Sequence, residues 1–303
     1  MILRWSALAH AKVNLALYVG KRRPDGYHPV ATVIQRLALH DRLEITVERD
    51  AAAELDVRVT SNLASVPADR ENLAGRAVEL LKPELDRAGF GNARIFIRIE
   101  KRIPVAAGLA GGSADAAAVL ASLDRRLGLG IGREELLRRA AALGSDVPAC
   151  LFEGATLGTG RGEHVRPVRA PVLWWVLAHP GGALLTREVY EAFDAGPSVA
   201  WNEEAELLEA LKPLVDALLK NSVAEIADRL YNDLQEASCN LHRGIGPLIH
   251  RMMAEGALGA IVSGSGPTVA GLAPSAAGAR RIARVLSKTG VWTWWGPGQA
   301  SLA

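Results

Sequence analysis

The sequence predicts an α+β protein with two domains, and two patterns carry this prediction. In the N-terminal third, apolar residues alternate with polar ones, as at Leu43, Ile45 and Val47, which is the period of half-buried strands. Later segments place apolar residues three and four positions apart, as on the buried face of a helix. The chain has 303 residues, 49% of them hydrophobic and 22% charged, so both domains have material for a core.

Each element follows from one of these periods. The strand period recurs at Leu55, Val57 and Val59 and at Ile95, Ile97 and Ile99, and a buried strand is expected at residues 174–177. Residues 259–271 read as two strands around a Gly-Ser turn, and residues 292–295 as a last strand. Helices are predicted over residues 71–81, 134–143 and 274–288 and over an Ala-rich stretch that ends at residue 123. Further helices are predicted within residues 202–230, where the apolar stripe consists of Leu207, Leu208, Leu211, Leu214, Leu218 and Leu219.

The domain boundary is expected where glycine and proline accumulate, in residues 154–171. This places one domain at residues 1–165 and the other at 166–303.

Composition excludes several classes of protein. Two cysteines are too few for a disulfide framework, which favours a reducing compartment. The net charge of +2 is a milder excess than that of a dedicated nucleic-acid binder. The longest apolar run, near residues 171–178, is far shorter than the roughly 20 residues that cross a bilayer. We therefore expect a cytoplasmic protein that binds neither nucleic acid nor membrane.

The strongest chemical signal is the glycine- and alanine-rich segment at residues 104–114, PVAAGLAGGSA. Small side chains leave backbone N–H groups accessible, and the helix expected after them adds unpaired donors and a positive dipole end, with Ser113 and Asp115 at its N-cap and first turn. No lysine follows these glycines, so this is not a Walker A loop, and the spacing G-x-x-G-G is not that of a dinucleotide fingerprint. Small residues between a strand and a helix also serve close packing alone.

Three further segments accompany the loop. Lys12 and Asn14 interrupt an apolar strand and point to the same face of it. If this face lines a cleft, the lysine offsets phosphate charge; otherwise the pair is simply exposed to solvent. Tyr27 and His28 follow a Pro-Asp-Gly turn and suit stacking on a nucleobase, although such residues are often ordinary surface or core residues. Asp146 follows a helix and precedes an apolar stretch, where it is either a helix cap or a general base.

In this order, and with the late glycine-rich stretch at residues 263–268, these segments resemble the GHMP kinase superfamily over nearly the whole chain. The combination of residues 11–15, 25–28 and 144–148 is similar in particular to the diphosphocytidyl-methylerythritol kinases. The resemblance implies a ribosomal S5 domain 2-like N-terminal domain that binds ATP and an α+β C-terminal domain that binds the substrate.

The resemblance also implies a reaction. The γ-phosphoryl group of ATP passes, with Mg²⁺, to the 2-hydroxyl group of the methylerythritol moiety of a cytidine diphosphate sugar alcohol. Asp146 takes the place of the general base, Lys12 the neighbouring cationic place, and Asn14 orients the substrate hydroxyl groups. The remaining implied contacts are Tyr27, His28, Thr186 and Tyr190 for the cytidine substrate, and Asn72, Lys101, Pro104, Val105, Ala106, Ala107, Gly108, Leu109, Ala110, Gly111, Gly112, Ser113 and Ala114 for ATP, with Ser113 also for Mg²⁺.

The loop departs from the family pattern at four positions. Ala106, Ala107 and Ala110 stand where the family has glycine, and Ala114 stands where it has a second serine. Alanine restricts the positive φ angles that glycine permits, but the backbone donors remain, so we expect phosphate binding to persist. Only Ser113 is left to offer a hydroxyl group to phosphate or metal.

Two other functions are compatible with the sequence. Another GHMP enzyme, such as a mevalonate or homoserine kinase, shares the ATP loop but has no need for the aromatic and imidazole groups of Tyr27, His28 and Tyr190. A non-catalytic nucleotide sensor or RNA-binding protein on the same fold is compatible with the mild basicity, but it needs neither Lys12 nor Asp146.

Overall fold

The computed structural model describes residues 1–49, 54–196, 201 and 203–301. These residues form two compact units, which we call the first unit (residues 1–11, 40–105 and 110–151) and the second unit (residues 12–39, 106–109 and 152–303). The long strands β1 (Ile2–Val19) and β2 (Val30–Arg49) each contribute to both units. Each unit is made of several separate segments of the chain. The expected division into residues 1–165 and 166–303, with one boundary, stays a prediction.

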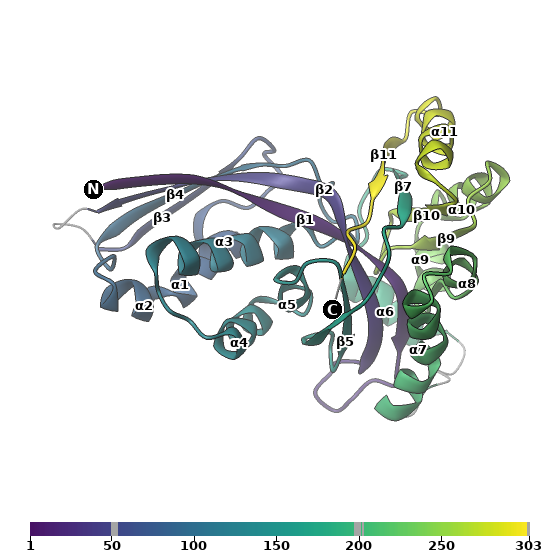
Figure 1. Ribbon diagram of the computed structural model, residues 1–303, viewed down its shortest axis with the longest axis horizontal. Coiled ribbons are helices and arrows are strands. Elements are labelled where there is room, and N and C mark those ends of the chain that lie inside the picture. The colour runs from purple at the N-terminus through teal and green to yellow at the C-terminus, as the bar shows by residue number, and fades with distance from the viewer. Residues whose placement is uncertain (50–53, 197–200, 202, 302–303) are drawn as a thin grey trace. The chain divides into compact units, whose positions relative to one another are not determined.

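The first unit packs helices against one face of a sheet (Figure 1). Strand β4 (Ala93–Glu100) pairs antiparallel with residues 42–49 of β2 and parallel with β3 (Asp56–Ser61). Buried and exposed residues alternate strictly along β4, as its sequence period predicts. The helices are η1 (Asp69–Glu71), α1 (Leu73–Leu80), α2 (Lys82–Arg87), α3 (Gly111–Leu127), α4 (Arg133–Leu143) and α5 (Val147–Cys150).

The core of this unit joins the inward side chains of the strands, such as Ile45, Ile95 and Ile97, to the alanine-rich face of α3. The sequence also favours a short strand at the start of residues 105–123, directly before the glycine loop, but the structure, which describes all of these residues, has no strand there. Strand β4 ends at Glu100, and residues 101–110 form an irregular connection to α3.

The second unit contains a four-stranded antiparallel sheet in the order β11 (Trp292–Pro297), β7 (Trp174–His179), β10 (Val269–Ala273) and β9 (Gly259–Val262). Its other strands are β8 (Tyr231–Asn232), which pairs with β1, and the hairpin of β5 (Ala155–Thr159) and β6 (His164–Val168), which pairs with β2 through β5. Its helices are α6 (Thr186–Asp194), α7 (Glu204–Leu219), α8 (Val223–Asp228), α9 (Gln235–Leu241), α10 (Ile245–Ala254) and α11 (Ala276–Ser287).

The α+β prediction is confirmed, with two local differences in the second unit. The segment expected as a Gly- and Pro-rich boundary forms the β5–β6 hairpin. The predicted leucine stripe of α7 is buried at Leu207, Leu211, Leu214 and Leu218, but Leu219 is exposed. No helix in the described part of the chain is long and apolar enough to cross a membrane.

Candidate active site

The phosphate-loop candidate connects β4 to the N-terminus of α3. Helix α3 begins at Gly111, so Ser113 lies inside its first turn, and the expectation that Ser113 is the N-cap was wrong. The N-cap is Ala110, whose carbonyl oxygen accepts a hydrogen bond from the Ala114 N–H group (2.9 Å). The first two residues of the helix are glycines. Because they have no side chains, the first backbone N–H donors of the helix remain accessible to an anion.

Two alanines of this loop adopt the left-handed conformation that glycine normally supplies. Ala106 has a φ of 53° and Ala110 a φ of 56°, while Ala107 between them is not among the residues with positive φ. A left-handed L-residue costs roughly 1–2 kcal/mol. The loop therefore keeps the backbone shape of a glycine-rich segment at the expense of local strain.

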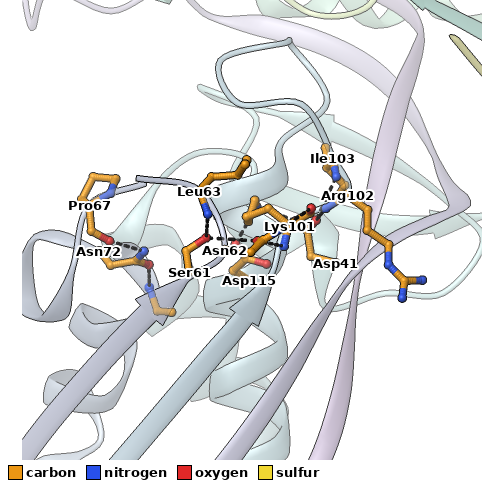
Figure 2. A network of polar contacts seen from close by, with 11 residues as sticks. Asp41, Ser61, Asn62, Leu63, Pro67, Asn72, Lys101, Arg102, Ile103 and Asp115 are labelled. Atoms are coloured by element: carbon orange, nitrogen blue, oxygen red, sulfur yellow. Dashed lines mark hydrogen bonds and ion pairs between the residues drawn. The ribbon is translucent and has the colours of Figure 1, made fainter. Parts of the chain in front are cut away.

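A buried ionic network, which we call the Lys101 triad, lies where β4 meets the loop (Figure 2). The ammonium group of Lys101 contacts a carboxylate oxygen of Asp41 and donates a hydrogen bond to Oδ2 of Asp115 (2.8 Å). All three side chains are almost wholly buried, at 4%, 0% and 2% exposure for Lys101, Asp41 and Asp115. The other oxygen of Asp41 accepts the N–H groups of Arg102 (2.6 Å) and Ile103 (2.9 Å).

The triad therefore joins both ends of the loop. Asp41 fixes the backbone before the loop, Asp115 belongs to the first turns of α3, and Lys101 links the two carboxylates. Asn62 adds to this anchor, because its Oδ1 accepts the Lys101 N–H (2.7 Å). An ideal Cβ at Gly111 would approach the Lys101 ammonium nitrogen to 3.2 Å, so a larger residue there would crowd the triad.

Burial raises the pKa of Asp115 to about 7, with Lys101 opposing the shift and the nearby Asp41 carboxylate adding to it. Its second oxygen, Oδ1, is buried and has no hydrogen-bond partner among the described residues. The pKa of Lys101 is raised in turn by the Coulombic attraction of Asp115 and Asp41, although its burial acts in the opposite direction. The ammonium group of Lys101 is thus engaged by carboxylates, and its expected contact with adenine stays a prediction.

Two further predicted residues of the first unit lie at helix starts. Asn72 is the N-cap of α1: its Oδ1 accepts the Ala74 N–H (2.9 Å), and its Nδ2 donates to the carbonyl oxygen of Pro67 (2.8 Å; Figure 2). Asp146 occupies the N-cap position of α5 but makes no side-chain capping bond, and it is half-buried. The Asp146 side chain therefore does not cap α5. Its role as a general base beside Lys12 stays a prediction.

Lys12 and Asn14 form a buried polar pair on β1 in the second unit. The Lys12 ammonium donates to Asn14 Oδ1 (2.7 Å), and Asn14 Nδ2 donates to Thr32 Oγ1 (2.9 Å), whose hydroxyl group donates to the Ala16 carbonyl oxygen (2.6 Å). Lys12 is 5% exposed and Asn14 3%, so the alternative of a solvated pair is wrong. The prediction that both residues share one face is confirmed.

The loop and the late glycine-rich stretch meet this pair. The Lys12 N–H group donates to the Leu109 carbonyl oxygen (3.2 Å), and the Ser263 hydroxyl group donates to the Gly108 carbonyl oxygen (3.0 Å). An ideal Cβ at Gly264, whose φ is 57°, would lie 3.2 Å from Lys12 Nζ and 3.3 Å from the Gly108 carbonyl oxygen. Glycine at 264 therefore permits the close approach of three chain segments around the lysine.

Two of the predicted base-binding residues, His28 and Tyr190, form a second cluster. His28 is buried, with Nδ1 2.8 Å from the Gly20 carbonyl oxygen and Nε2 3.3 Å from a carboxylate oxygen of Asp194. Its ring lies 5.1 Å from that of Tyr190, at an angle of 34°. Tyr27 is 52% exposed, so its ring remains accessible to an aromatic ligand.

Thr186 begins α6, the helix that carries Tyr190 and Asp194. Its hydroxyl oxygen lies 3.0 Å from that of Ser265, in the late glycine-rich stretch. Sequence reasoning missed Ser265 as a partner, and it also missed Thr32 beside Asn14 and Asp41 in the triad. For Asp41 a signal existed: it occupies an apolar-face position in the alternating run of Leu37, Leu39, Leu43 and Ile45.

A metal ion finds no preformed cage in the described residues, which contain no group of three His, Cys, Asp or Glu side chains suited to hold one. The donor set at the loop is a hydroxyl group, that of Ser113, in the first turn of α3. In P-loop enzymes a serine or threonine hydroxyl group holds Mg²⁺ together with a carboxylate, so Ser113 fits Mg²⁺ as one ligand beside phosphate oxygens and water.

Comparisons with known proteins match both halves of the chain. The model of the GHMP kinases N terminal domain matches residues 72–154, and that of the GHMP kinases C terminal domain matches residues 214–291. The chain is 41% identical over 282 residues to the 4-diphosphocytidyl-2-C-methyl-D-erythritol kinase of Moorella thermoacetica, covering 93% of this chain and 94% of that protein. It is 41% identical over 281 residues to the enzyme of the same name from Mycobacterium avium, covering 92% and 86%.

Solved structures agree with these matches. A crystal structure of 4-(cytidine 5'-diphospho)-2C-methyl-D-erythritol kinase superposes with a TM-score of 0.77 at 33% identity, covering 98% of this chain and 100% of that one. Homoserine kinase from Cytophaga hutchinsonii shares the fold, with a TM-score of 0.76 at 19% identity, covering 98% and 95%. The resemblance inferred from the loop and its three companion segments is confirmed: the chain belongs to the GHMP kinase family.

Proposed function

We propose that this protein is an ATP-dependent kinase that phosphorylates the 2-hydroxyl group of 4-diphosphocytidyl-2-C-methyl-D-erythritol. The observation that carries the proposal is the junction in the second unit where Lys12 meets residues 108–109 of the loop and Gly264. A buried ammonium group beside a phosphate-binding loop is the arrangement that phosphoryl transfer uses to offset charge. The relatives that match over more than nine-tenths of this chain carry the name of this activity.

The reaction needs positioning and charge stabilisation more than covalent help from the protein. The acceptor hydroxyl oxygen forms a bond to the γ-phosphorus, the bond from that phosphorus to the β,γ-bridging oxygen breaks, and ADP leaves. In this proposal Asp146 accepts the hydroxyl proton, Lys12 stabilises the charge on the transferred group, and Asn14 orients the acceptor. Buried Asn14 is suited to this because Thr32 fixes its amide.

The nucleotide is held by the first backbone donors of α3, with Asn72 near the adenine. Ser113 would hold Mg²⁺, which would supply positive charge to offset that of the phosphates. Tyr27, His28, Tyr190 and Thr186 face the cytidine part of the acceptor. The protein would act in the cytoplasm on a small-molecule substrate.

The test is to identify the product. Incubation with Mg-ATP and 4-diphosphocytidyl-2-C-methyl-D-erythritol should yield ADP and one new phosphomonoester in equal amounts, seen by ³¹P NMR, with carbon-2 of the methylerythritol coupled to the new phosphorus. A phosphomonoester on another hydroxyl group, or ADP formed without any phosphorylated acceptor, would contradict the proposal.

A further inference from the structure

The tip of the β5–β6 hairpin is a part of the second unit to which no role has been assigned. It consists of Gly160, Arg161 and Gly162, and both glycines have positive φ, at 72° and 109°. The Gly160 carbonyl oxygen accepts the N–H group of Val30 (2.7 Å), two residues after His28, and the Gly162 N–H donates to Thr159 (3.0 Å). The first bond holds the tip beside the segment that contains Tyr27 and His28, and the second closes the turn itself.

Arg161 extends its guanidinium group from this tip over the ring of Tyr27. The guanidinium carbon lies 4.8 Å from the ring centroid, within the range of a cation–π contact. The Arg161 side chain is 35% exposed, and its Nε lies 3.4 Å from a carboxylate oxygen of Glu163. Glu163 also accepts the backbone N–H of Arg161, so the base of the side chain is fixed while its charged end lies on an accessible aromatic face.

The other arginines of this region are engaged differently. Arg22 donates to the Gly26 carbonyl oxygen (3.0 Å) and lies 3.9 Å from Asp194, and Arg23 lies 3.7 Å from Asp25. These contacts hold the turn at residues 22–26 in shape. Arg161 also has a carboxylate neighbour, Glu163, but of these three arginines it is the one whose guanidinium lies over the Tyr27 ring, where it can meet the charged part of a ligand stacked there.

We propose that Arg161 is a substrate-binding residue that pairs with the diphosphate of a pyrimidine nucleoside diphosphate whose base stacks at Tyr27. This inference rests on the proposed function, and it adds a determinant of substrate affinity that the sequence did not reveal. The planar guanidinium offers parallel N–H donors that match phosphate oxygens, which a point charge does not. Without ligand, the same group rests on the Tyr27 ring.

The test compares three ligands of decreasing charge, CDP, CMP and cytidine, by isothermal titration calorimetry on the whole protein. Replacing Arg161 with Gln should weaken CDP binding by about 10- to 100-fold, the range for a lost charge-assisted contact, and CMP binding by less. Cytidine affinity should stay within about twofold, because no phosphate is present to lose its partner. Arg161→Lys, which keeps the charge but not the fork, should lie between wild type and Arg161→Gln for CDP.

Arg166→Gln is the matched control, since Arg166 is an exposed arginine on β6 of the same hairpin. It should leave all three affinities unchanged. Equal weakening of CDP, CMP and cytidine by Arg161→Gln would mean that Arg161 only supports the Tyr27 ring, and no weakening would mean that it is a surface residue; either result overturns this role and leaves the proposed function standing. Wild-type protein that binds none of the three ligands would overturn the cytidine function and this role together.

Discussion

Lys101 donates a hydrogen bond from its ammonium group to Asp115 across 2.8 Å, and both side chains are buried. The bond joins the first residue after β4 to the first turns of α3. Lys101, which the resemblance to GHMP kinases assigns to the nucleotide, is therefore an anchor of the loop in this structure. The Asp115 carboxyl, with its raised pKa, makes this anchor sensitive to pH.

Replacing Asp115 with Asn should change how stability depends on pH. The folded pKa of about 7 exceeds the usual value for an aspartate, so the folded protein retains a proton that the unfolded chain releases. Stability from this group is therefore fully present below pH 4 and is lost as pH rises toward 7, by at most about 1.4 kcal/mol per pH unit.

Urea unfolding between pH 5 and 8 measures this dependence. The stability of Asp115→Asn, whatever its absolute value, should rise relative to wild type as pH increases, because the amide cannot ionise. Asp216→Asn, a change at an exposed position of α7, should run parallel to wild type. Parallel curves for Asp115→Asn would show that this carboxyl does not titrate in that range.

Glycine at the strained loop positions should stabilise the protein. Ala106→Gly and Ala110→Gly each relieve a positive φ, and the gain should be about 0.5–1 kcal/mol after the greater backbone entropy of glycine in the unfolded chain is subtracted. Ala107→Gly is the control: Ala107 is buried and lacks a positive φ, so the change should destabilise. Denaturant midpoints give the comparison, and a loss of stability in all three variants would contradict the assignment of strain.

The catalytic assignment predicts large losses in turnover. Asp146→Asn and Lys12→Met should each lower kcat by roughly 10²- to 10⁴-fold, the range for a general base or a charge-stabilising group. Circular dichroism and the thermal midpoint should confirm that each variant is folded, with Asp216→Asn again as the surface control. Variants that keep most of kcat would remove Asp146 and Lys12 from the mechanism.

Base recognition predicts a selective change in KM. Tyr27→Ala should raise KM for the cytidine substrate about 5- to 100-fold, as expected for a lost stacking contact, and leave KM for ATP nearly unchanged. Steady-state kinetics with each substrate varied in turn separates the two constants. If both KM values rise together, Tyr27 is a packing residue and the assignment fails.

The sequence predicted features that depend on local period and missed those that depend on distant pairing. The shared face of Lys12 and Asn14 follows from strand alternation, and the strand at Ile95 to Ile99 does as well. The start of α3 was misplaced because Gly111 and Gly112 have poor helix propensity, yet the packing of the helix against its neighbours admits them.

The contacts that could not be predicted join residues far apart in the chain. Lys101 meets Asp41 across 60 residues, and Thr186 meets Ser265 across 79. The stacking of Arg161 on Tyr27 requires the β5–β6 hairpin, whose glycines and prolines resemble those of a linker when only the sequence is considered. Tertiary packing decides such pairs, and local propensity carries no information about them.

The acceptor that this protein uses is measured by the rate of ADP release with Mg-ATP and each of three alcohols, 4-diphosphocytidyl-2-C-methyl-D-erythritol, mevalonate and homoserine. We expect turnover with the first alone, at a kcat/KM at least about 10³-fold above the other two, since a site with polar groups built for one ligand rejects those that leave them unpaired. Preferred turnover of mevalonate or homoserine would contradict the cytidine assignment while leaving the GHMP kinase fold intact.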